Sequence, residues 1–179
     1  MRHPRLNLTE KVPVRPEQLG GAQETRLTIT ALPLLNDLPI DELKLETRTR
    51  ITNGRVANVA EGLSVERAQL DVGLTVEGMT VAGSARVGPI PARLRAELDF
   101  RSGPPGQVTE RVQVEGRATA ANLARFGVDV APYLGGAFGF SVQGERLRSK
   151  AVRATVAADL REARIALKPF DYAKPAGAP

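Results

Sequence analysis

The chain has 179 residues, no cysteine and a formal net charge of +5. That length suits one domain with a single core, and the missing thiols exclude disulfides, thiolate metal sites and a cysteine nucleophile. No apolar run approaches the roughly 20 residues that cross a bilayer, so we expect a soluble chain, whose exporting segment, if it is exported, lies outside this sequence.

The N-terminal part of the sequence carries the weakest pattern. Residues 1 to 24 are polar and basic, and we expect a poorly ordered or edge segment there, followed by a single domain over 25 to 179. Strands are predicted at 25 to 31 and 43 to 51. The stretch PLLNDLPIDELKLE at 33 to 46 fits neither the helical nor the strand period. A short helix and an irregular turn both stay open for it.

Apolar and polar side chains alternate strictly in the next part of the chain. The apolar positions are even from 68 to 76 and odd from 79 to 87, after Glu77 and Gly78. A two-residue turn at Glu77 and Gly78 would pair Val76 with Met79 and Leu74 with Val81. Such a hairpin keeps every apolar side chain on one face of a sheet.

The same alternation continues toward the C-terminus. A loop at 88 to 91 returns the chain, and the apolar positions are even again from 92 to 100. Strands are predicted at 108 to 116 and 137 to 143, after the loop SGPPGQ at 102 to 107. The stretch 152 to 160 (VRATVAADL) is predicted to form a last hairpin with 163 to 167, through a turn at Arg161 and Glu162.

One segment, TAANLARFG at 119 to 127, has a helical pattern. Thr119 is a suitable N-cap, Leu123 and Phe126 share a face, and Gly127 is placed to end the helix. At about 1.5 Å per residue such a helix spans about 12 Å, whereas a ten-residue strand runs roughly 33 Å. The helix is therefore too short to cover the apolar face of some eight strands.

Two architectures could deal with that face. The meander could fold on itself as a sandwich or closed barrel, or it could stay open as a curved trough. Small inward residues such as Ala68, Ala85 and Ala92 suit both. From the residues alone the sandwich is preferred, because soluble monomers seldom expose contiguous apolar patches beyond several hundred Å².

Enzymatic chemistry finds little support in the sequence. The single histidine, His3, lies in the polar start, and no serine has a histidine partner for a triad. The carboxylates Glu97, Asp99, Glu115 and Asp159 alternate with arginines, as on a solvated strand face. We therefore predict no enzyme activity, no metal and no cofactor. With seven aromatic residues and no interleaving of basic and aromatic positions, nucleic-acid binding is not expected either.

Three stretches give the sequence a likeness to a known family. VGPIPARLRAELDF (87 to 100), VQVEGRATAANLARFGVDVAPYLGGAFGFSVQG (112 to 144) and LKPFDYAKPAGAP (167 to 179) resemble the AsmA-like superfamily, in particular its YhdP branch and TamB relatives. The likeness covers about the C-terminal half of the chain. It implies a mainly β fold, an antiparallel meander of long strands that forms a curved open groove (β-taco-like), with the short helix near 119 to 127.

The function that this resemblance implies is lipid transfer. Such proteins are bridge-like, lie in the periplasm, and move phospholipid between the inner and outer membranes in outer-membrane biogenesis. They begin with a transmembrane helix, so this chain resembles an internal segment, anchored through a part that it does not contain. Adjoining β-groove segments of a longer chain would then be its neighbours. The alternative is a β-sandwich interaction module without a ligand.

The residues expected to line the lipid-binding groove are the larger apolar side chains of the alternating strands. A lining without polar anchors binds acyl chains by contact area, so that sliding along it costs little. The basic stretch from Arg146 to Lys168 is a candidate for docking on an anionic membrane surface. The lining residues are Leu70, Val72, Leu74, Val76, Met79, Val81, Leu94, Leu98, Phe100, Phe138, Phe140, Val152, Val156, Ile165 and Leu167.

Overall fold

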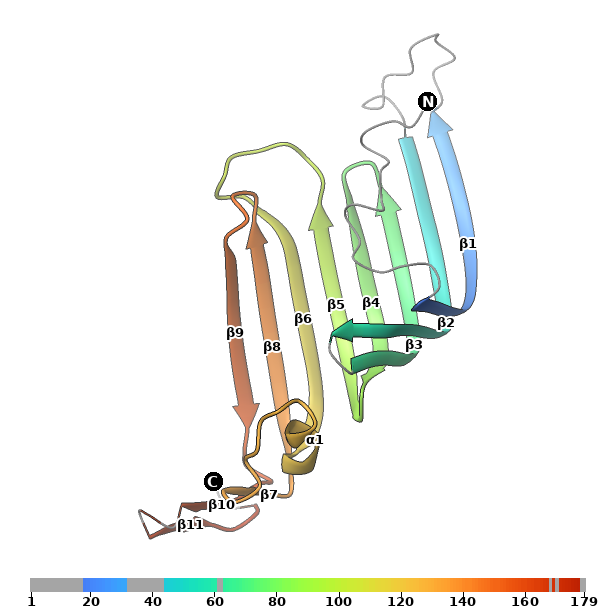
Figure 1. The fold of residues 1–179 in the computed structure, drawn as a ribbon. Helices are drawn as coiled ribbons and strands as arrows, with labels where there is room; N and C mark the ends of the chain where they lie inside the picture. The colour runs from blue at the N-terminus through green and yellow to red at the C-terminus, as the bar shows by residue number, and fades with distance from the viewer. Residues whose placement is uncertain (1–17, 32–43, 61–62, 168, 170, 178–179) are drawn as a thin grey trace.

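The computed structural model describes residues 18–31, 44–60, 63–167, 169 and 171–177. Its main element is an eight-stranded antiparallel sheet in which strands next to each other in the sheet are also consecutive strands of the meander (Figure 1). The predicted fold class is confirmed: the chain is mainly β, with one short helix, and the sheet does not close into a barrel. Its strands are β1 Leu19–Ala31, β2 Lys44–Ala60, β3 Leu63–Thr75, β4 Gly78–Val87, β5 Ile90–Asp99, β6 Val108–Thr119, β8 Ala137–Leu147 and β9 Val152–Asp159.

Only part of the N-terminal region to which the sequence-based predictions apply lies within the described residues. β1 begins at Leu19, ahead of the expected start at residue 25, and it is an edge strand of the sheet. Most of the stretch at 33 to 46 lies outside the described residues, and β2 begins at Lys44.

Cross-strand pairing explains why the apolar side chains share one side of the sheet. Residues directly opposite each other in neighbouring strands point to the same face. One such row crosses the sheet from β3 to β9 through Leu70, Gly83, Leu94, Val114, Val142 and Val156. We call the side that carries this row the apolar face, and the opposite side, which carries the alternating charged residues, the polar face.

The first hairpin has the predicted face but not the predicted pairing. Leu74 lies opposite Met79, not opposite Val81, and Val76 is part of the turn instead of pairing with Met79. The hydroxyl of Thr75 accepts hydrogen bonds from the backbone N–H groups of Glu77 and Gly78, the two residues that follow Val76, at 3.2 Å each. This shift of the turn moves the pairing by an even number of positions, so the apolar residues keep their face.

The second hairpin is tighter than predicted. Val87 lies opposite Ile90, so that Gly88 and Pro89 alone form the turn, and β5 begins two residues earlier than the predicted strand. Gly88 has a φ of 56°, in the left-handed region that glycine adopts without strain. The chain can therefore reverse in two residues at this point.

The predicted C-terminal hairpin is wrong. After β9 the chain turns at Arg161 and Glu162 and leaves the main sheet. It forms a separate three-stranded sheet from β7 (Leu134–Gly135), β10 (Arg164–Leu167) and β11 (Tyr172–Lys174), in the order β11-β10-β7. The even-to-odd change of apolar positions at this turn thus marks entry into a second sheet.

The predicted helix is present and shorter. α1 comprises Ala120–Ala124, and Thr119 caps it: the Thr119 hydroxyl accepts from the backbone N–H of Asn122, whose side-chain oxygen accepts from the Thr119 N–H. This reciprocal pair satisfies two backbone donors at the helix start. The remaining residues to Gly127, where φ is 79°, form turns.

The core of the molecule lies at one end of the main sheet. Ile90, Ala118, Phe138 and Ala163 form the buried cluster, and Leu123, Phe126, Leu134, Phe140 and Leu160 pack against it. These residues come from the lower ends of β5, β6 and β8 in Figure 1, from the α1 region and from the chain that enters the small sheet. We call this assembly the cap, because it covers the apolar face at that end.

Near the same end the sheet bends sharply. The lower parts of β2 and β3 turn and run across the direction of the other strands (Figure 1). The bend coincides with pairing irregularities between Ile51 and Gly54 in β2 and between Glu66 and Gln69 in β3, and with positive φ angles at Asn53 and Arg67. Bulges of this kind bend a strand and increase its twist.

Candidate functional site: the apolar face of the main sheet

Most of the predicted lining residues do lie together. The strand positions and pairings place eleven of them on the apolar face, namely Leu70, Val72, Leu74, Met79, Val81, Leu94, Leu98, Phe138, Phe140, Val152 and Val156. They come from β3, β4, β5, β8 and β9, so five strands contribute to one surface.

Four predicted lining residues lie elsewhere. Val76 is a turn residue, and Phe100 follows the end of β5, where its side chain is about half exposed. Ile165 and Leu167 belong to β10 of the small sheet. All four were assigned by extending the alternation past the point where the strand of the main sheet ends.

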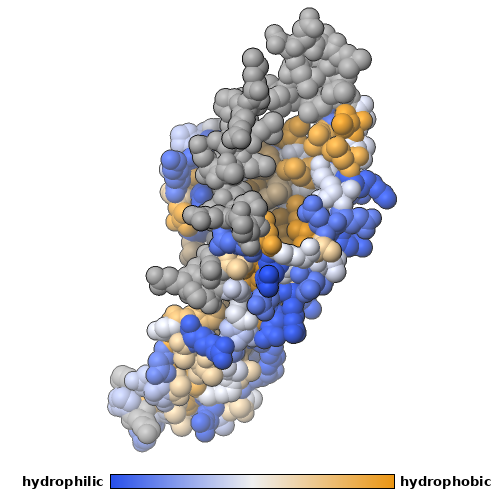
Figure 2. Space-filling view, turned by 45° about the vertical axis from the view of Figure 1, so that its right-hand side comes forward, coloured by the Kyte–Doolittle hydropathy of each residue, from blue (hydrophilic) through white to orange (hydrophobic). Residues whose placement is uncertain are grey.

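The apolar face is buried at the cap and open away from it. Ala68, Ala85 and Ala92 form a buried track beside the bend, and the ring of Phe140 lies over Gly116. No large side chain among the described residues is completely buried. Figure 2 shows apolar side chains gathered in a recess on the side of the molecule that faces the viewer there.

Exposure increases toward the strands at both edges. Val112 in β6 is 39 % exposed, Leu27 in β1 55 % and Val156 in β9 70 %. In the part of the chain that the structure describes, the only other sheet has three short strands, so no layer of comparable size packs on the eight-stranded sheet. The sandwich preferred from the residues alone is not what these residues form.

The apolar face also carries polar groups that sequence reasoning missed. Thr49 lies opposite Val72 and therefore points to the apolar face, where its hydroxyl hydrogen-bonds that of Thr25 at 2.9 Å. Toward β9, an ion pair of 3.2 Å joins Arg146 to Glu110, which lies opposite Leu98. In the predicted strands at 43 to 51 and 108 to 116, Thr49 and Glu110 already alternate in step with the apolar residues. The predicted lining nevertheless contained no polar residue.

The polar face is a surface of matched charges. Arg111 lies between Glu97 and Glu145, with closest N–O distances of 3.7 and 3.2 Å, and Arg50 pairs with Asp71 at 3.1 Å. These side chains are all at least one-third exposed, so each pair contributes little to stability. Their arrangement is that of a solvated strand face, as the interleaved charges predicted.

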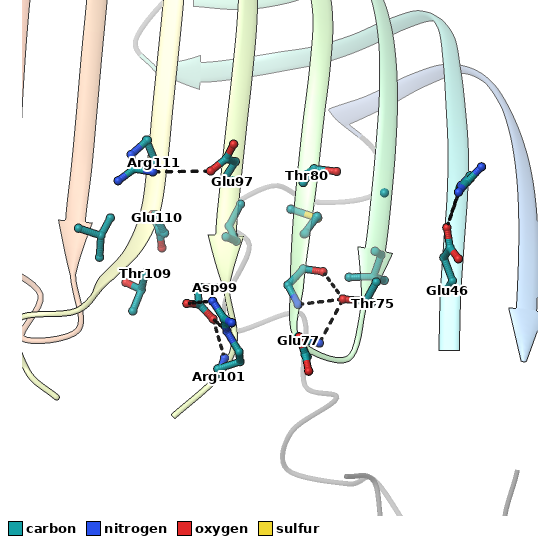
Figure 3. Close-up of a pocket in the computed structure, with 17 residues that line it drawn as sticks. Glu46, Thr75, Glu77, Thr80, Glu97, Asp99, Arg101, Thr109, Glu110 and Arg111 are labelled. Atoms are coloured by element: carbon teal, nitrogen blue, oxygen red, sulfur yellow. Dashed lines mark hydrogen bonds and ion pairs between the residues drawn. The ribbon is translucent and has the colours of Figure 1, made fainter. Parts of the chain in front are cut away.

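Two shallow hollows lie mainly on this polar face. One, of about 650 Å³, lies at the sheet end away from the cap, with Glu46, Thr80, Glu97 and Arg111 among its lining (Figure 3). The other, of about 490 Å³, is lined by residues of β3 to β6. In Figure 3 the arginines Arg111 and Arg101 turn toward acidic neighbours, so this hollow does not present unpaired cations to a ligand.

An Asp-x-Arg clamp ends two strands. Asp99 at the end of β5 accepts hydrogen bonds from the Arg101 backbone N–H at 3.0 Å and from its guanidinium at 2.9 Å. Asp159 at the end of β9 is held in the same way by Arg161. These hydrogen bonds lower the pKa of the Asp159 carboxyl to about 2 and that of Asp99 still further below its ordinary value. Both carboxylates are therefore ionised at neutral pH, and each holds the residues that follow its strand.

The basic stretch does not form a single patch. Arg146 points to the apolar face and pairs with Glu110, whereas Arg153 lies opposite Glu145 on the polar face. Arg148 donates to the Arg101 backbone carbonyl and to Gln107, joining two loops, and Arg161 is engaged by Asp159. Lys168 lies outside the described residues. Docking of this stretch on an anionic membrane surface stays a prediction.

The described residues also bear on a metal-binding site. Across the described ranges, no cluster of three or more His, Asp or Glu side chains is placed to hold a metal ion. His3 falls outside those ranges. The prediction that the chain is not an enzyme stays a prediction.

Comparisons with known proteins add no relative. No family model matches the chain, and neither a curated protein nor a solved structure matches it. Among the described residues, no helix has the length and apolar character that crossing a membrane requires.

Proposed function

We propose that this chain is a lipid-binding β-groove segment of a bridge-like lipid-transfer protein of the AsmA-like type, which carries phospholipid acyl chains along its apolar face. The observation that carries the proposal is the one-sidedness of the eight-stranded sheet: apolar residues from successive strands share one face, and the cap covers that face at one end. The periplasmic location, the inner-membrane anchor in a part outside this chain and the role in outer-membrane biogenesis follow from the resemblance of the sequence alone.

The energetics of such a face favour passage over storage. A fully buried methylene gains about 0.8 kcal/mol, and on a half-open surface about half of that is available. Ten methylenes laid on the face then gain about 4 kcal/mol, which corresponds to a dissociation constant of about 1 mM. One acyl chain is therefore held weakly enough to slide, whereas the two chains of a phospholipid together gain about 8 kcal/mol, which corresponds to a dissociation constant of about 1 μM and keeps lipid on the protein during purification.

The two polar sites on the apolar face would limit where chains can lie. Thr25 and Thr49 lie in β1 and β2, beyond the β3 end of the apolar row, and the Glu110–Arg146 pair joins β6 to β8 beside Leu98, at the strand ends away from the cap. Acyl chains would lie on the apolar row, and headgroups would reach the polar pairs or water. The two hydroxyls hydrogen-bond each other, and the two charged side chains pair with each other. These polar groups therefore cost little free energy on the apolar face when no headgroup is present.

The proposal is tested by extracting the purified chain with organic solvent and identifying lipids by mass spectrometry. We expect phospholipid in the extract, and we expect Leu94→Gln to lower the amount several-fold, because Leu94 lies in the middle of the apolar row. Arg95→Gln is the matched control, one residue along the same strand and on the polar face. Circular dichroism checks that both variants keep the β fold.

Two results would count against lipid binding. A lipid-free extract from the unmodified chain would favour the alternative, an interaction module without a ligand. Equal lipid content in Leu94→Gln and Arg95→Gln would mean that lipid adheres without regard to face. Val112→Gln, at a position already 39 % exposed, serves as a second variant if Leu94→Gln fails to fold.

A further inference from the structure

The outer edge of β9 is an exposed, regular strand. β9 is last in the order of the main sheet, and among the described residues only β8 pairs with it. Every residue of β9 is exposed, including Val152 at 66 % and Val156 at 70 %. A free edge of this kind presents a row of backbone N–H and C=O groups that can pair with another strand.

Two features that commonly protect an edge strand, a proline and a pairing irregularity, are absent from β9. Its sequence, VRATVAAD, contains no proline and no lysine, and its pairing with β8 runs without irregularity from Arg146↔Val152 to Gly139↔Asp159. β1 at the opposite edge differs, because its pairing with β2 is interrupted near Gly21 and again near Ile29. An interrupted strand is a poorer template for addition of a new strand. Of the two edges, β9 is therefore the one suited to pairing.

The sequence of β9 is complementary to itself in one antiparallel register. Residues on the apolar face must lie opposite residues on the apolar face of the second copy. This restricts the choice to registers in which one residue of β9 lies opposite its own copy, and we call that residue the centre. With Val156 at the centre, Ala154 lies opposite Ala158, and Arg153 lies opposite Asp159 of the second copy. Centring on Thr155 leaves Arg153 opposite an alanine, and centring on Ala157 sets Arg153 against Arg161. The Val156 register alone pairs opposite charges on the polar face and apolar residues on the other.

We propose that the β9 edge pairs with the β9 edge of a second copy of this chain, antiparallel and centred on Val156. A two-fold axis perpendicular to the sheet keeps both apolar faces on the same side, so the two sheets form one continuous sheet with a continuous apolar face. An interface that uses the same strand from both copies is closed, and the assembly stops at the dimer. This inference does not depend on whether the apolar face binds lipid.

Cysteine cross-linking tests the register directly, because the chain contains no cysteine of its own. Residues that face each other in an antiparallel pair have Cα atoms about 4.5–5.5 Å apart, which suits a disulfide. We expect Val156→Cys to form a covalent dimer under mild oxidation. Ala154→Cys should not, because the two copies of residue 154 would lie four positions apart along the strand, about 13 Å. A mixture of Ala154→Cys and Ala158→Cys should cross-link, whereas neither does so alone.

Sedimentation velocity tests the assembly without cross-links. We expect a concentration-dependent dimer that Arg153→Glu weakens at least tenfold, since the two-fold axis places two Glu–Asp repulsions in each dimer. Arg26→Glu makes the same change of charge on β1 and should leave the dimer constant unaltered. A chain that stays monomeric at all concentrations would overturn the proposal. So would equal cross-linking at residues 154 and 156, or a loss of assembly in Arg26→Glu, which would point to head-to-tail pairing of β9 with β1.

Discussion

The unequal burial of the apolar face makes a quantitative prediction about two truncations. Phe138 lies in the cap and is 6 % exposed, whereas Leu27 lies on the same face in β1 and is 55 % exposed. Phe138→Ala should lower the free energy of unfolding by about 3–5 kcal/mol, the range for large-to-small changes in a packed core. Leu27→Ala removes three carbons, worth about 2.4 kcal/mol if fully buried. With less than half of that surface hidden, the expected loss is about 1 kcal/mol.

Urea unfolding followed by far-ultraviolet circular dichroism measures both losses, and the unmodified chain provides the reference. The contrast between the two variants is the decisive quantity, because it does not depend on the absolute stability. A loss for Leu27→Ala as large as that for Phe138→Ala would mean that the apolar face is sealed in a dry interior. The account of an open face capped at one end would then be refuted.

Three further changes test separate features. Gly83→Ala should cost about 1–3 kcal/mol in urea unfolding, because an added Cβ would lie 2.0 Å from the Gln69 carbonyl oxygen; Gly144→Ala, with open space around it, is the control and should be nearly neutral. Thr119→Ala should cost about 1 kcal/mol by removing the N-cap of α1, and an unchanged melting midpoint would argue against the capping box. The pKa of Asp159 is lowered from 3.8 to about 2 by its Arg161 hydrogen bonds, so its stabilising contribution is complete above 3.8 and is lost as pH falls through about 2. Asp159→Asn should flatten this acid limb of the stability profile, and an unaltered limb would contradict the clamp.

The alternation of side chains was sufficient to predict which face is apolar. Leu94 and Arg95 show why: in a regular strand, neighbours along the sequence must point to opposite sides, whatever the exact pairing. The pairing itself was not predictable, because Leu74 opposite Met79 and Leu74 opposite Val81 give the same faces. Only the turn geometry, here fixed by the hydroxyl of Thr75, distinguishes the two.

Alternation could not show where a strand leaves its sheet. Ile165 and Leu167 continue the apolar period after the turn at Arg161, yet they belong to the small sheet. A period of two is a property of any strand, and it carries no record of the partner. The partners of β10 are the two-residue strand β7 and the three-residue strand β11, and both are too short to give a periodic signal.

The bend in β3 did leave a trace in the sequence. Val65 and Ala68 both carry apolar side chains, but their separation of three positions breaks the period of two. The structure has a pairing irregularity at this point, with a positive φ at Arg67. An interruption of the alternation inside an otherwise regular strand is thus a usable sign of a bulge. The dipeptide Asn53-Gly54, next to it in β2, is a second such sign.

The bend of the sheet and the chemistry of its apolar face depend on different residues. Curvature depends on a few backbone positions, such as Gly21, Asn53 and Arg67, where φ is positive. The chemistry of the surface depends on side chains farther along the strands, which take no part in the bending. Substitutions of these side chains could therefore make the surface more apolar, more polar or more charged while the shape of the sheet is retained. The same sheet could in this way be adapted to bind ligands of different chemistry.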